Sequence, residues 1–108
     1  IGGDLQVWKY PIHPIKINYN SLGCWRDSGN RAIKPTLPGY NPSQKIRINE
    51  CAERAAKAGY SVFGVQYGGE CWSSKDAGKT YRKYGRANNC SKDGTGGTWA
   101  NSVYQLKK

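Results

Sequence analysis

Alternation of apolar and polar positions along the chain predicts a small antiparallel sheet. Residues 61–67 alternate between the two faces of a strand. Gly68-Gly69 then gives the signal of a two-residue hairpin into a partner strand through residues 71–72. Residues 22–25 and 99–106 show the pattern of two further strands, the second of which would close the sheet.

One helix is predicted between Asn49, a suitable N-cap, and Gly59, a common C-terminal stop. Its body is rich in alanine and carries acids in the first turn, where the helix dipole favours them. Small apolar residues share one face, so the helix is expected to lie close against a flat partner such as a sheet. That face comprises Ile48, Cys51, Ala52 and Ala55, and the i,i+4 pairs Glu50–Arg54 and Glu53–Lys57 lie on the other.

The remaining segments are predicted as short strands and long loops. Two edge strands are expected around residues 5–7 and 15–17, and prolines make residues 34–43 an extended surface loop. Residues 73–98 look irregular, and residues 94–97 look like a flexible glycine-rich loop. The predicted fold class is α+β, with one helix packed on a small, mainly antiparallel sheet in a single domain over residues 1–108.

The four cysteines predict two disulfides and an oxidising, extracellular setting. They lack the close spacing of zinc ligands, and the single histidine, His13, lies far from all of them. Three connectivities are compatible with the sequence. The preferred one is Cys51–Cys71, joining helix to hairpin, with Cys24–Cys90 tying the front of the chain to the long loop.

The chain has a formal net charge of +10, which favours polyanionic partners such as sulfated glycans, nucleic acid or anionic surfaces. No apolar run approaches the roughly 20 residues of a membrane span. Ile1-Gly2-Gly3 is compatible with a mature end left by processing. A secreted protein is therefore expected.

A set of motifs resembles the WSC domain. They are Gly23-Cys24-Trp25-Arg26-Asp27, Arg31-Ala32, Cys51-Ala52, and the stretch of residues 59–72, which ends in Gly68-Gly69-Glu70-Cys71-Trp72. The resemblance covers about residues 22–74, and this chain has fewer cysteines than the family usually carries. It implies a helix cradled by an antiparallel sheet, as in PAN/apple-like folds, and carbohydrate binding outside the cell.

A carbohydrate site is predicted around the hairpin, because sugars bind on aromatic faces flanked by hydrogen-bonding side chains. Trp25 and Trp99 are expected in the core, whereas Trp72 suits either the core or the site. The candidate carbohydrate-binding residues are Gln66, Tyr67, Glu70 and Trp72, joined by Asp27 and Asn101 from neighbouring strands.

A second candidate site is cationic and would bind phosphates or sulfates. If residues 79–86 form a short helix, four of its cations share one face, although a solvated charged face is the common alternative. The candidate polyanion-binding residues are Lys75, Lys79, Arg82, Lys83, Arg86 and Lys92.

Binding is better supported than catalysis, so we expect a non-enzymatic protein without cofactor or metal. His13 lies in a strand-like stretch, and only a meeting of Asp27 with Glu70 would suggest a hydrolase or metal site. The primary prediction is a secreted lectin-like module in defence or adhesion, for which multivalency would favour a homo-oligomer. The alternative is a cationic toxin or antimicrobial effector acting on anionic surfaces or polyanions.

Overall fold

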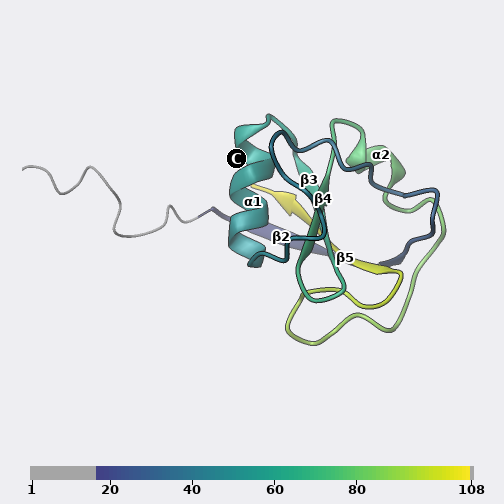
Figure 1. Cartoon of the computed structure of the whole chain (residues 1–108). Coiled ribbons are helices and arrows are strands. Elements are labelled where there is room, and N and C mark those ends of the chain that lie inside the picture. The colour runs from purple at the N-terminus through teal and green to yellow at the C-terminus, as the bar shows by residue number, and fades with distance from the viewer. Residues whose placement is uncertain (1–16, 108) are drawn as a thin grey trace, which may run out of the picture.

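The computed structural model describes residues 17–107 and confirms the α+β class. Its antiparallel sheet has the strand order β2-β5-β3-β4, with a helix on each side (Figure 1). The expected strand around residues 5–7 lies outside the described residues, as does most of the one at 15–17. The elements in chain order are β2 (Tyr19–Arg26), α1 (Ile48–Lys57), β3 (Val62–Gln66), β4 (Glu70–Ser73), α2 (Ala77–Thr80) and β5 (Ala100–Leu106).

Helix α1 packs on one face of the sheet, as its small apolar residues predict. Cys51, Ala52 and Ala55 are fully buried there. The Phe63 ring stacks on the Tyr104 ring with centroids 5.2 Å apart. The Cys51–Cys71 disulfide joins the helix to β4, which confirms the preferred pairing.

The ends of α1 differ in part from the prediction. The N-cap is Arg47, without a side-chain cap, and Asn49 lies inside the helix, where its Nδ2 donates to Glu53 Oε2 over 3.2 Å. The Glu50–Arg54 ion pair forms at 3.6 Å, and Gly59 follows the helix with φ +83°. The stop signal was therefore correct, whereas the cap was placed two residues too late.

The opposite face of the sheet is covered by the chain after β2 and by α2. Trp25, Trp72 and Val103 are buried there against Ile33 and Ala77. A second, smaller core thus lies on the side of the sheet away from α1.

The segment from Cys90 to Trp99 is fixed to the sheet, although the sequence predicted a flexible loop at residues 94–97. The Cys24–Cys90 disulfide holds its start, again as preferred. The Gly96 N–H donates to Ser102 Oγ over 3.1 Å, and the Gly96 carbonyl accepts from the Ser91 N–H at 2.8 Å. These bonds fix the path of the chain toward Trp99.

The position of Gly96 leaves no room for a side chain, so its substitution should destabilise the fold. Its φ is +75°, and a Cβ would lie 2.1 Å from the Val65 carbonyl oxygen, whereas the Cβ position at Gly59 meets nothing within 4 Å. We expect Gly59→Ala to lower the free energy of unfolding by about 1 kcal/mol through φ strain alone. Gly96→Ala should lower it by more than about 3 kcal/mol or prevent folding. Denaturant unfolding of both variants checks this, and equal costs would contradict the packing described for Gly96.

Candidate functional site

The two large hydrophobic residues exposed in the described part of the chain are Tyr67 (54% exposed) and Trp99 (48%). They are also its two non-glycine residues with positive φ, at 49° and 52°. Their turns adjoin, because the Tyr67 N–H donates to the Gly97 carbonyl over 3.3 Å. Such strained backbone clusters at functional sites. The expectation that Trp99 lies in the core is wrong, since the turn before β5 directs its side chain outward.

Arg31 lies against both Trp99 and Trp72. Its guanidinium carbon is 4.1 Å from the ring centroid of Trp72 and 4.8 Å from that of Trp99, so it makes a cation–π contact with each. Arg31 thereby links a buried tryptophan to an exposed one.

The buried carboxylate of Asp27 holds Arg31 in this place. Asp27 Oδ2 accepts hydrogen bonds from Arg31 at 2.9 Å and from Gln66 Nε2 at 3.0 Å. Asp27 Oδ1 accepts from the Ala32 N–H at 2.9 Å. Asp27 itself is only 4% exposed, so this charge is almost fully withdrawn from water. The segment after β2 is therefore anchored to strand β3.

The structure brings several of the predicted sugar-binding residues together but buries most of them. Asp27 contacts Gln66, which pairs with Asn101 across the β3–β5 ladder. Asp27, Gln66, Asn101 and Trp72 are all buried, Glu70 is half-buried, and Tyr67 is exposed. Direct contact of these six residues with a sugar stays a prediction.

Sequence reasoning missed Arg31 and Trp99 as site residues. The available signal for Arg31 was its i,i+4 spacing from Asp27, but outside a helix that spacing does not imply contact. For Trp99 nothing in the sequence signalled exposure, because tryptophan is highly buried on average.

Three buried polar atoms beside this cluster have no hydrogen-bond partner among the described residues. They are Trp72 Nε1 and both polar atoms of the Asn101 amide. Asn101 Cγ lies 3.2 Å from the position of a Cβ on Gly64, so the amide fits only because that residue is glycine. Buried polar groups are normally paired, so the Asn101 amide is a cost to stability.

The cationic residues are all exposed, but they do not form the helical stripe that the sequence suggested. Helix α2 ends at Thr80, and Arg86 instead forms a bridge with Trp25 and stacks on its ring at 4.6 Å. Lys75 and Lys83 line a common pocket, whereas Lys79, Arg82, Arg86 and Lys92 lie outside its lining. The exposed predicted cations are Lys75, Lys79, Arg82, Lys83, Arg86 and Lys92.

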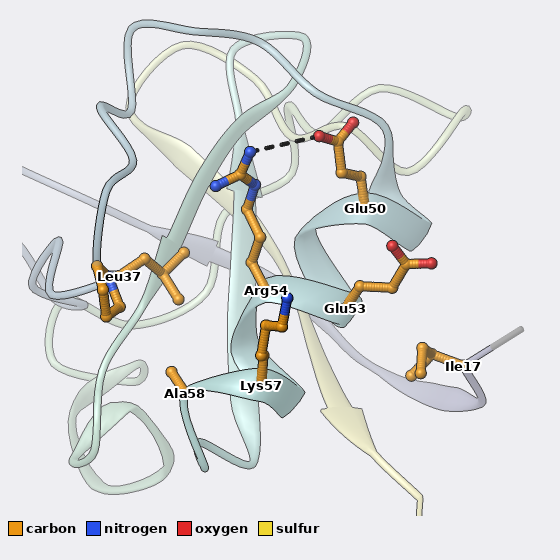
Figure 2. A pocket seen from close by; sticks show the side chains of 8 residues that line it. Ile17, Leu37, Glu50, Glu53, Arg54, Lys57 and Ala58 are labelled. Atoms are coloured by element: carbon orange, nitrogen blue, oxygen red, sulfur yellow. Dashed lines mark ion pairs between the residues drawn. The ribbon is translucent and has the colours of Figure 1, made fainter. Parts of the chain in front are cut away.

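Another pocket lies elsewhere, beside helix α1, with a volume of about 660 Å³ (Figure 2). Its charged residues are mixed in sign, and Arg54 pairs with Glu50 one turn away on the same helix (Figure 2). No aromatic ring lines it, so it lacks the flat apolar surface that a sugar ring needs. It is lined by Ile17, Leu37, Pro38, Glu50, Glu53, Arg54, Lys57 and Ala58.

Within residues 17–107, no three His, Cys, Asp or Glu residues gather in a way that could hold a metal ion. None of the helices there is long and apolar enough to cross a membrane.

The fold defines a small α+β module whose helix is joined to the sheet by a disulfide, and the comparison with known families identifies the family. The WSC domain profile matches residues 21–99, beyond the segment of about 22–74 expected from the motifs. The chain belongs to the WSC domain family. No solved structure gave a match.

The curated relatives are larger proteins. The chain is 40% identical over 58 residues to the xylosyltransferase oxt of Drosophila melanogaster, covering 52% of this chain and 6% of that enzyme. It is 34% identical over 83 residues to Kremen protein 1 of Xenopus laevis, covering 76% of this chain and 17% of that protein. The match to the xylosyltransferase is thus confined to a small part of the enzyme, and its activity is not transferred to this chain.

The unpaired amide of Asn101 and the paired amide of Gln66 lead to opposite stability predictions. Asn101→Leu keeps the side-chain shape and removes two unpartnered polar atoms, so it should raise the free energy of unfolding by about 1 kcal/mol. Gln66→Met also keeps the shape but deprives the buried Asp27 of a donor, so it should lower that free energy by about 1.5–3 kcal/mol. Denaturant unfolding measures both. A destabilised Asn101→Leu variant would show that the Asn101 amide is hydrogen-bonded in the folded protein.

Proposed function

We propose that this WSC domain is a secreted carbohydrate-binding module that holds a sugar ring against Trp99. The observation that carries the proposal is an exposed tryptophan in strained backbone, with a guanidinium fixed beside it. An exposed aromatic plane is the usual surface for the C–H groups of a sugar. Tyr67, exposed on the adjoining turn, would be a second aromatic contact for a longer glycan.

Preorganisation of the site supports the proposal. Arg31 is held by the buried Asp27 and by the Trp72 ring, so the guanidinium adjacent to Trp99 loses little freedom when a ligand arrives. Its remaining N–H groups are donors of the kind that sugar hydroxyls accept. In this proposal Trp99 and Arg31 contact the sugar, while Asp27, Gln66 and Trp72 position Arg31.

Extracellular location is part of the same proposal. The two disulfides fit an oxidising compartment, and WSC domains occur in extracellular or membrane proteins. A defence or adhesion role would follow from the kind of glycan that is bound.

Substitution of Trp99 tests the proposal. Trp99→Leu keeps an apolar side chain but removes the aromatic plane, and it should weaken binding to the best neutral glycan at least tenfold, or about 1.4 kcal/mol. Trp99→Tyr keeps a plane and should lose much less. Glycan-array screening at high salt identifies the ligand, and titration calorimetry measures the affinities.

Thermal unfolding of each variant provides the folding control, because a half-exposed side chain should change the melting temperature only slightly. Unchanged affinity in Trp99→Leu would contradict the proposed site. Leakage of anionic vesicles that no sugar inhibits would support a membrane-active toxin in place of a lectin.

A further inference from the structure

A cationic pocket adjoins the proposed sugar site. It has a volume of about 310 Å³, and four cationic side chains and a single carboxylate, Asp76, are among the residues that line it. Arg31 belongs to this pocket and also contacts Trp99, so the pocket and the exposed tryptophan share one residue. The cationic residues are Arg31, Lys34, Lys75 and Lys83.

The walls of the pocket are joined by hydrogen bonds between segments far apart in the sequence. Thr80 Oγ1 donates to the Ala32 carbonyl, which ties α2 to the segment after β2. Thr36 Oγ1 lies 3.2 Å from the carbonyl oxygen of Ser73 at the end of β4. The lysines therefore lie on segments that hydrogen bonds hold to one another.

The lysine charges are available to a ligand. Within residues 17–107, no carboxylate forms an ion pair with Lys34, Lys75 or Lys83, and all three side chains are exposed. The Lys83 ammonium lies 5.3 Å from the centroid of the Tyr84 ring. Several unpaired cations around one concave surface attract an anion and release counterions when it binds.

We propose that the glycan bound by this domain is sulfated, and that a sulfate group binds between Lys34, Lys75 and Lys83 while a sugar ring lies on Trp99. This inference rests on the proposed carbohydrate-binding function and names its ligand class. A sulfated glycan is favoured over nucleic acid because the two disulfides fit an oxidising compartment, where glycans are the commoner polyanions. Arg31, shared by both surfaces, lies where the sugar and its sulfate would join.

The experiment compares a sulfated oligosaccharide with its chemically desulfated form. Lys34→Gln/Lys83→Gln should weaken binding of the sulfated form about tenfold and reduce the slope of log K against log salt by about two. The matched control is Lys57→Gln/Lys107→Gln, which removes the same charge from exposed residues outside the pocket and should change the affinity less than twofold.

Substitution of Asp76 should have the opposite effect on affinity, because it removes a negative charge from the pocket. The Asp76 side chain forms no capping hydrogen bond in α2, so Asp76→Asn removes this charge without removing such a bond. Affinity for the sulfated oligosaccharide should rise two- to threefold, while affinity for the desulfated form stays the same.

Several outcomes would overturn the inference. Equal losses in the two double variants would show a diffuse charge effect, and equal affinity for the sulfated and desulfated forms would show that sulfate is not recognised. Equal competition by single-stranded DNA of the same charge would assign the pocket to polyanions in general. A different result would contradict only the proposed sugar contact at Trp99. In that case Lys34→Gln/Lys83→Gln would lose sulfate-dependent binding, whereas Trp99→Leu would keep it.

Discussion

The exposed side of this domain depends on the buried carboxylate of Asp27. A carboxylate withdrawn from water is very costly unless it is paired and hydrogen-bonded. Here it accepts hydrogen bonds from Arg31, the Ala32 N–H and Gln66. Satisfying it obliges the chain after β2 to turn back over the sheet, and the same turn places Arg31 beside Trp99. The buried Asp27 carboxylate thus fixes the position of Arg31 beside the exposed Trp99, without itself contacting a ligand.

The two faces of the sheet are held by different kinds of interaction. The face under α1 is apolar and is cross-linked by Cys51–Cys71, so it is a conventional core. The other face mixes tryptophans with a charged network and carries the unpaired Asn101 amide. Natural proteins tolerate such costs at functional sites more readily than in their cores. The unpaired Asn101 amide thus lies on the face where Arg31 reaches the exposed Trp99, while on the α1 side Arg54 Nε is also buried without a partner among residues 17–107.

The preferred disulfide pairing rested on which predicted elements carry the cysteines, and the structure confirms it. Local signals in the sequence predicted the helix and the main strands, because periodicity acts over short distances. They failed where distant segments decide the structure. Residues 79–86 do not continue as a helix because the Arg26 N–H donates to the Gly85 carbonyl and the Ala87 N–H donates to the Cys24 carbonyl. The link between Gln66 and Asp27 spans 39 residues and has no local signature. The predicted two-residue hairpin is a three-residue turn, because Tyr67 itself adopts positive φ and Gln66 pairs with Glu70.

Both exposed aromatic residues lie against a cation, and this constrains the ligand. The Lys45 ammonium is 4.5 Å from the Tyr67 ring centroid, as the Arg31 guanidinium is 4.8 Å from that of Trp99. A purely apolar partner would have to desolvate these charges without compensation, which is unfavourable. A glycan avoids that cost, because its hydroxyl oxygens accept hydrogen bonds while its C–H groups cover the ring. An anionic glycan gains in addition from the net positive charge of the chain. The pairing of ring with cation therefore favours a polar, ring-shaped and negatively charged ligand over a hydrophobic protein surface.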